Sequence, residues 1–139
     1  MVDQNCAYCV EGDLVAKFGI KICELETSKV YLFKEQSHPG RCIVAHKKHV
    51  GDMNELTAEE RAAYFEDVAR VARAIMKAFN PDKVNYGAYG DTGHHLHFHL
   101  CPKYKDEYEW GGVFLMNPDK KYLTDEEYAA MIEKIKANL

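Results

Sequence analysis

The sequence predicts an α+β domain, an antiparallel β-sheet with a long helix packed on it and a C-terminal helix. Two observations lead to this prediction. Short apolar segments separated by turn residues fill most of the first half of the chain, which is typical of an antiparallel meander. Two longer segments carry apolar residues at helical spacing behind a capping signal. Because the chain has 139 residues, we expect one domain, residues 1–139.

Six strands are expected, each a short run of apolar and β-compatible residues bounded by glycine, proline or polar turn residues. Their ranges are residues 14–18, 20–25, 29–33, 41–45, 83–88 and 95–100. The close spacing of the first four strands favours antiparallel pairing between neighbours. The last two strands follow the long helix, so the order is strands, helix, two strands and a final helix, which is typical of an α+β domain with a helix packed on an antiparallel sheet.

Both expected helices begin with a capping box, in which a threonine and a glutamate three residues later satisfy free backbone N–H groups. The long helix follows Thr57 and ends before Asn80-Pro81, and the C-terminal helix follows Thr124. Apolar residues mark one face of each helix. They are Phe65, Val68, Ala72, Ile75, Met76 and Phe79 in the long helix, and Tyr128, Met131, Ile132, Ile135 and Leu139 in the C-terminal helix.

The composition excludes several classes of protein. A net charge of -4 gives no overall attraction to nucleic acid or to anionic membranes. No apolar run is long enough to span a membrane, and the N-terminal residues lack the regions of a signal peptide. We therefore expect a cytoplasmic protein. The cysteine count of 5 is odd, and Cys6 and Cys9 form a close pair, which favours thiols or metal ligands over disulfides.

Three alternating histidines are the most informative feature of the chain. His95, His97 and His99 are separated by single apolar residues. Because successive side chains of a strand point to opposite faces, these three residues, the histidine row, are expected to line one face while the apolar residues pack behind them. His94 falls on the apolar face or just before the strand and receives no role.

The row has three interpretations. Surface or packed histidines are the simplest, but three at period two beside a glycine-containing turn make this a poor explanation. A three-histidine metal site is the second. The third is a phosphoryl or nucleotidyl transfer site with one imidazole as nucleophile. The preceding turn supports the third, because its glycines, Gly93 among them, let backbone N–H groups approach an anion, and the Thr92 hydroxyl can donate to a phosphate oxygen.

The histidine row with its apolar residues resembles the signature of the histidine-triad superfamily of nucleotide hydrolases and transferases. The resemblance covers nearly the whole chain. It includes the early Cys-x-x-Cys, the segment from Pro39 to His49, the capped helix and an asparagine before the turn. It implies hydrolysis at the α-phosphate of a purine nucleotide conjugate, such as a nucleoside phosphoramidate or a dinucleoside polyphosphate. A nucleotide-binding partner protein with little catalysis, a nucleotidyltransferase and a three-histidine metalloenzyme are the alternatives.

The resemblance also implies roles for individual residues. His97 would be the nucleophile that forms a nucleotidyl-histidine intermediate, and the His95 carbonyl would orient its ring. His99 would donate to phosphate oxygens. Thr92, with Gly93 beside it, and Asn85 would contact the phosphate or the leaving group.

Two positions depart from the family pattern. Many members carry a histidine where this chain has Arg41. An arginine there could contact phosphate or lie on the surface, but it cannot donate a proton because it stays charged. Glu35 is the available choice for the carboxylate that usually binds the ribose.

The resemblance further implies a structural zinc ion, one per chain, and a homodimer. Some relatives bind zinc through residues that correspond to Cys6, Cys9, His49 and His95. Two thiolates and two imidazoles form the closed tetrahedral set of structural zinc. His46 competes with His49 for the third position. The segment around Trp110 would reach the partner subunit in a homodimer, or form a surface loop.

Overall fold

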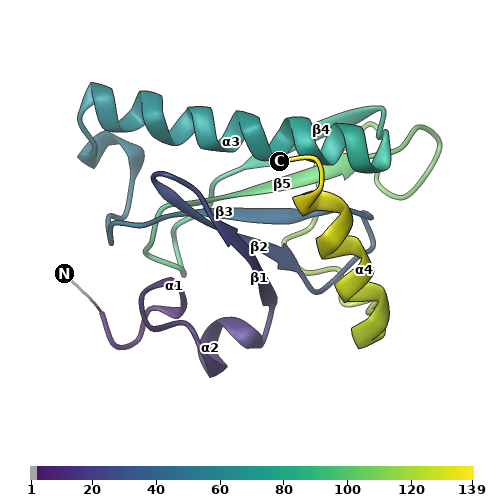
Figure 1. Ribbon diagram of the computed structural model, residues 1–139, viewed down its shortest axis with the longest axis horizontal. Coiled ribbons are helices and arrows are strands. Elements are labelled where there is room, and N and C mark those ends of the chain that lie inside the picture. The colour runs from purple at the N-terminus through teal and green to yellow at the C-terminus, as the bar shows by residue number, and fades with distance from the viewer. Residues whose placement is uncertain (1–2) are drawn as a thin grey trace.

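The protein folds into a five-stranded antiparallel sheet with helices on both faces (Figure 1). The computed structural model describes residues 3–139. The strands are β1 (Gly19–Glu24), β2 (Ser28–Phe33), β3 (Cys42–His46), β4 (Lys83–Gly87) and β5 (His97–Lys103). Their order in the sheet is β1-β2-β3-β5-β4, and every neighbouring pair is antiparallel. The predicted α+β fold is confirmed.

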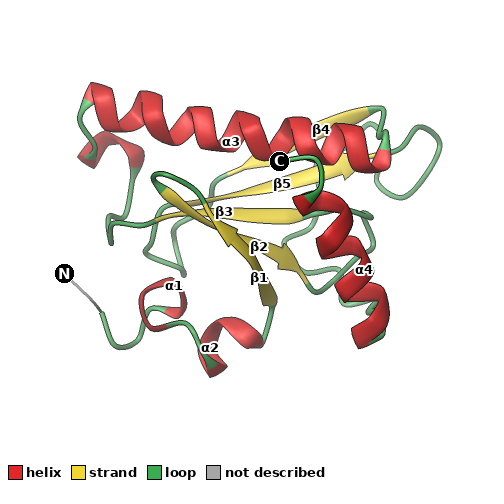
Figure 2. Cartoon of the chain, viewed as in Figure 1, coloured by secondary structure: helices red, strands yellow, loops and turns green. Residues whose placement is uncertain are grey.

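The helices form two groups, and each group covers one face of the sheet (Figure 2). The long helix α3 (Ala58–Phe79) and the C-terminal helix α4 (Asp125–Lys136) pack on one face, and the short helices α1 (Ala7–Val10) and α2 (Asp13–Ala16) pack on the other. A single 3-10 turn, η1 (Met53–Glu55), precedes α3. Within residues 3–139, no helix combines the length and the hydrophobicity that a membrane crossing requires.

Both predicted capping boxes are present. The Thr57 and Thr124 side chains accept from the backbone N–H groups of Glu60 and Glu127, whose carboxylates accept in return. The long helix ends at Asn80, which adopts a left-handed conformation with φ of 49° just before Pro81. The long helix therefore starts and stops where the sequence places it, whereas the C-terminal helix ends at Lys136, so Leu139 of its predicted apolar face lies beyond it.

The buried face of α3 is rotated slightly from the predicted one. Val68, Ala72 and Ile75 are buried as expected, but Phe65 and Met76 are 39% and 41% exposed. Tyr64 takes the central place, because its hydroxyl donates to the Val44 carbonyl at 2.8 Å while its ring packs beneath the sheet. Hydrophobic spacing alone did not reveal that a tyrosine would find a buried acceptor.

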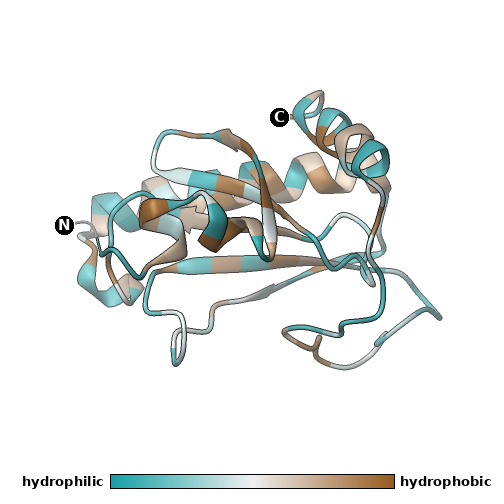
Figure 3. Cartoon of the chain, turned by 90° about the horizontal axis from the view of Figure 1, so that it is seen from below, coloured by the Kyte–Doolittle hydropathy of each residue, from teal (hydrophilic) through white to brown (hydrophobic). Residues whose placement is uncertain are grey.

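The opposite face of the sheet holds a smaller core. Tyr8 and Val15 from the short helices pack against Tyr31, Phe33 and Ile43 of the sheet. Figure 3 looks at the molecule from this side and shows hydrophobic turns on both short helices. The short helices α1 and α2 are therefore folded onto the sheet face that carries the histidines.

One predicted strand is wrong and one begins later than predicted. Residues 14–18 form most of α2 rather than a strand, because Asp13 opens a helical turn after Gly12 and Val15 packs inward. A short apolar run fits one helical turn as well as a strand. The last strand begins at His97, so His95 lies in the turn before β5, and β5 continues to Lys103.

Candidate functional site

The histidine row is buried in the middle of the sheet. β5 lies between β3 and β4, and the register places His97 beside Ala45 and His99 beside Ile43. The three histidines are only 2%, 8% and 3% exposed, in chain order. Leu96, Phe98 and Leu100 belong to the core under α3 and α4. The predicted alternation is therefore confirmed, and the imidazoles face the short helices.

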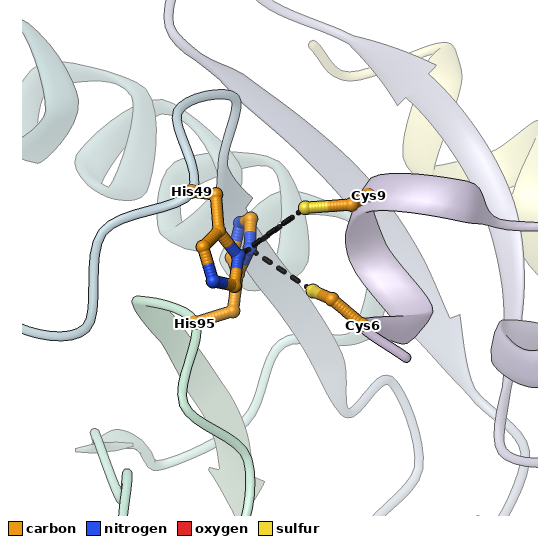
Figure 4. A group of neighbouring side chains, drawn as sticks. All are labelled: Cys6, Cys9, His49 and His95. Carbon is orange, nitrogen blue, oxygen red and sulfur yellow. Dashed lines mark hydrogen bonds between the residues drawn. The ribbon is translucent and has the colours of Figure 1, made fainter. Parts of the chain in front are cut away.

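Four side chains from three separate segments converge at one end of the row (Figure 4). This four-residue cluster consists of Cys6, Cys9, His49 and His95, whose donor atoms all lie within 4.8 Å of one another. The Nδ1 atom of His95 lies 3.2 Å from the Cys6 sulfur and 3.6 Å from the Cys9 sulfur. The Nδ1 atom of His49 lies 3.3 Å from the Cys9 sulfur and 3.1 Å from the His95 Nδ1 atom.

Local backbone structure explains this convergence. Cys6 precedes the single turn of α1, and Cys9 lies three residues later, so both thiols leave the same side of that turn. The segment after β3 is tied to the segment before β5 by two backbone hydrogen bonds, from His46 N–H to the Leu96 carbonyl and from Leu96 N–H to the Val50 carbonyl. These bonds hold His49 next to His95. Four such donor atoms can share one metal ion.

The structure shows which of the two candidate histidines, His46 or His49, belongs to the cluster. The Nδ1 atom of His46 accepts from the Lys48 backbone N–H at 2.9 Å, and its ring packs on Tyr64. The His46 carbonyl instead accepts a hydrogen bond from the Nε2 atom of His95 at 2.7 Å. His49 therefore belongs to the four-residue cluster, while His46 supports it from behind through its backbone.

His97 has one nitrogen engaged in a hydrogen bond, and its side chain lines a pocket. Its Nδ1 atom lies 2.7 Å from the His95 carbonyl oxygen, so Nδ1–H donates and Nε2 keeps its lone pair. Burial lowers the pKa of His97 below its ordinary value, which favours this neutral form. The ring of Tyr8 lies 5.1 Å from that of His97. Tyr8 was not singled out from the sequence, although it lies inside the Cys-x-x-Cys motif.

The pocket beside His97 has a volume of about 410 Å³ and is lined by both predicted turn residues, Thr92 and Gly93. Tyr8, Phe18 and Met116 complete its apolar wall. A Cβ atom on Gly93 would lie 3.7 Å from the His97 ring, which shows how closely the turn approaches the imidazole. The pocket therefore combines an apolar wall with a hydroxyl, exposed backbone and a free imidazole nitrogen.

Asn85 lies apart from this pocket. It lines a separate hollow with Lys83, Lys103 and Trp110, farther along the same face of the sheet. Its register partner is Cys101, two residues beyond His99. The structure thus brings Thr92 and Gly93 to His97 and leaves Asn85 outside the group.

Arg41 occupies neither of the two places expected for it. Its side chain is completely buried, and its guanidinium contacts the Nδ1 atom of His99 at 3.0 Å and 3.3 Å. Burial and the neighbouring guanidinium lower the pKa of His99 to about 2, so this imidazole is neutral. The carbonyl acceptors of this buried arginine lie 74 and 75 residues away in the chain, and no local pattern around Arg41 indicates them.

The interpretation of Glu35 as a ribose ligand has no support. Its carboxylate accepts hydrogen bonds from the Ser37 N–H and hydroxyl and from the backbone N–H groups of Lys120 and Lys121. Burial alone would raise the pKa of Glu35, but these donors outweigh it and hold the pKa below its usual value. Glu35 fastens the C-terminal segment to the sheet.

The fold and the row together are those of a known class of proteins. The chain belongs to the HIT domain family, whose profile matches residues 19–106. It is 28% identical to the adenosine 5'-monophosphoramidase of Schizosaccharomyces pombe over 97% of this chain and 98% of that protein.

Two crystal structures show the same fold. A histidine triad protein from Sinorhizobium meliloti superposes with a TM-score of 0.84 at 23% identity, over 92% of this chain and 95% of that one. A Zn-bound histidine triad family protein from Mycobacterium smegmatis superposes with a TM-score of 0.67 at 21% identity, over 95% of this chain and 94% of that one.

Proposed function

We propose that this chain is a nucleotide hydrolase that acts at the α-phosphate of a purine nucleotide conjugate through a nucleotidyl intermediate on His97. The observation that carries the proposal is the geometry of His97. Its Nδ1–H donates to the His95 carbonyl, its Nε2 atom has no hydrogen-bond partner among residues 3–139, and its side chain lines a pocket. The relative from Schizosaccharomyces pombe is named for hydrolysis of a nucleoside phosphoramidate, which is the same class of substrate.

The proposed reaction has two steps. The Nε2 lone pair of His97 attacks the α-phosphorus, an Nε2–P bond forms, and the bond to the leaving group breaks with its electron pair. The leaving group then takes a proton from water. In the second step water attacks the phosphorus, the Nε2–P bond breaks, and a nucleoside monophosphate leaves. The His95 carbonyl stabilises the charge that the imidazole gains in the first step.

His99, Thr92 and Gly93 are proposed to bind the phosphate. The Thr92 hydroxyl and the backbone around Gly93 line the same pocket as His97. His99 follows His97 on the same face, with ring centroids 5.5 Å apart. Donors on two sides of the phosphorus stabilise the negative charge of the transition state. Asn85 lies in a separate hollow, so the proposal assigns it no contact with the leaving group.

We infer that the four-residue cluster binds one structural zinc ion. Around a tetrahedral zinc, sulfur and nitrogen donors lie roughly 3.3–3.8 Å apart. Four of the donor pairs lie 3.1–3.6 Å apart and all pairs lie within 4.8 Å, so small shifts of these side chains would bring the four donors to that geometry. When bound, the ion supplies a rigid link and no reaction chemistry, because all four of its positions are taken by protein. The hydrogen bond from His95 to the His46 carbonyl orients one of the ligands.

A homodimer and a cytoplasmic location also stay predictions. Trp110 is 41% exposed, and Val113 and Leu115 near it are 81% and 56% exposed. Apolar side chains at such exposure are typical of a surface that meets a partner. Light scattering of the purified protein would measure the mass, and a monomer at micromolar concentration would contradict the homodimer.

The decisive experiment traps the intermediate. The protein is mixed with a nucleoside phosphoramidate, quenched, and analysed by mass spectrometry of its peptides. We expect a nucleotidyl group on the peptide that contains His97, and none in the His97→Ala variant. His38→Ala is the control, because His38 does not line the pocket and no proposed step uses it. Tight nucleotide binding without turnover of phosphoramidates or dinucleotides would instead indicate a nucleotide-binding partner protein.

A further inference from the structure

Arg41 is a buried charge without a carboxylate partner. Its side chain is 0% exposed, and none of the ion pairs among residues 3–139 includes it. A guanidinium keeps its charge even when buried, so its N–H groups must find acceptors inside the protein. Because burial of a guanidinium costs free energy, we expect Arg41 to have a specific role beside the histidine row.

The acceptors of Arg41 come from two places. Nη1 donates to the Leu115 carbonyl at 3.0 Å, and Nη2 donates to the Met116 carbonyl at 2.9 Å. The remaining acceptor is the Nδ1 atom of His99, 3.0 Å from Nη2 and 3.3 Å from Nε. Phe33 and Phe114 cover the two sides of the guanidinium, with ring centroids 4.3 Å and 4.8 Å away. Arg41 therefore joins the row to the segment that carries one wall of the pocket.

The contact with His99 determines where that imidazole holds its proton. A guanidinium has only donors, so the Nδ1 atom of His99 must accept and cannot carry a hydrogen. The neutral ring then has its hydrogen on Nε2. A proton on Nδ1 would break both hydrogen bonds. If Nε2 were protonated as well, two cations would lie side by side in a buried site. His99 is thereby restricted to a single tautomer that can donate from Nε2.

We propose that Arg41 is a positioning residue that keeps His99 as a fixed, neutral Nε2–H donor to the phosphate. The same guanidinium holds the backbone of Leu115 and Met116 beside His99. This inference rests on the proposed function of the row. The proposal also assigns different roles to His97 and His99, which have similar surroundings. His97 offers a lone pair from its Nε2 atom because a carbonyl occupies its Nδ1–H, and His99 offers a hydrogen from its Nε2 atom because Arg41 occupies its Nδ1. His99 accordingly binds the phosphate and carries no proton between steps.

The first test needs no substitution. Long-range correlation of the imidazole protons with ¹⁵N in the zinc-loaded wild-type protein reports which ring nitrogen of each histidine is protonated. We expect an unprotonated Nδ1 and a protonated Nε2 in His99, and the reverse in His97. A His99 ring that carries a hydrogen on Nδ1 at neutral pH would overturn the proposal whether or not the protein has activity.

The second test removes the guanidinium. Arg41→Ala leaves a cavity with the shape of the missing side chain. We expect His99 to populate both tautomers in this variant. We also expect kcat to fall about 10-fold to 100-fold, which does not exceed the loss known for a missing oxyanion donor. KM should change less than kcat, because the donor matters most in the transition state. Guanidinium ion added below denaturing concentrations should restore both the tautomer and part of kcat. Unchanged kcat with an unchanged tautomer would overturn the proposal.

Glu109→Gln is the matched control. The Glu109 carboxylate accepts from the Leu115 backbone N–H at 3.1 Å and contacts His38, so its loss loosens the same segment without touching His99. We expect the His99 tautomer to stay unchanged in this variant. A tautomer change equal to that of Arg41→Ala would show that the segment, and not Arg41, controls His99. Absence of turnover in the wild type would refute the proposed function and leave the tautomer result standing.

Discussion

At one end of the histidine row, His95 turns its Nδ1 atom toward two thiols and a second imidazole. At the other end, His99 turns its Nδ1 atom toward a guanidinium. The first arrangement suits a metal ion, since every donor can offer a lone pair, while the second suits only a hydrogen bond from arginine. His97 lies between them, bound to a carbonyl. The partner of one ring nitrogen thus decides what the other nitrogen can do, although the three side chains are identical.

Substitution of the central histidine gives the largest expected effect. We expect His97→Ala to lower kcat by about 10⁴-fold or more, because a covalent route without its nucleophile leaves only binding contributions. Nucleotide binding should change little, since the rest of the pocket remains. Steady-state kinetics on a nucleoside phosphoramidate and calorimetry with the product nucleotide measure the two quantities. Near-normal turnover would show that the three histidines do not divide their roles as proposed.

Removal of a thiol tests the metal end of the row. We expect Cys6→Ser to reduce the zinc content from one per chain to near zero and to lower stability by several kcal/mol, because metal binding energy contributes directly to folding. Elemental analysis and thermal melts provide the measurements. Cys101→Ser is the control, since Cys101 is buried away from the cluster, and it should keep its zinc. A Cys6→Ser protein with full metal content would refute the site.

Two polar residues near the row lie in different hollows, so their substitution tests which hollow binds the substrate. Thr92 lines the pocket of His97, whereas Asn85 lies in a different hollow. We expect Thr92→Val to lower kcat/KM by about 10-fold, the value of one hydrogen bond to a charged group, and Asn85→Ala to change it less than about twofold. An equal loss for Asn85→Ala would restore the role that the sequence assigned to that residue.

Glu35→Gln gives the smallest effect on the site and acts on stability alone. Its carboxylate holds four donors, so we expect a loss of about 1–3 kcal/mol in the free energy of unfolding, with zinc content and kcat unchanged. The pKa of Glu35 is held below its usual value. Its stabilisation is therefore complete above the unfolded glutamate pKa of roughly 4.3 and is lost as the pH falls below it. Melts of both proteins as a function of pH should converge in acid; a constant difference would contradict this.

Features that repeat along the chain could be predicted from the sequence, whereas the position of a side chain that depends on one distant contact could not. The alternation of the row and the two capping boxes each involve several residues in a fixed relation, so strand face and helix start followed from them. Residues 14–18 contain four apolar residues and one lysine, a run too short to distinguish a strand from a helical turn. The burial of Arg41 depends on the carbonyl groups of Leu115 and Met116. The position of the Glu35 carboxylate depends on the backbone N–H groups of Lys120 and Lys121. Contacts across more than 70 residues leave no local signature.

The four-residue cluster has a consequence for how the folded state responds to its surroundings. It joins Cys6 to His95 across 89 positions of the chain, so its geometry exists only when the N-terminal turn has docked on the sheet. An ion that binds the folded chain alone shifts the folding equilibrium by mass action. Once the site is near saturation, each tenfold change in free zinc concentration alters stability by about 1.4 kcal/mol. The folded fraction of this protein would then record how much zinc is available to it.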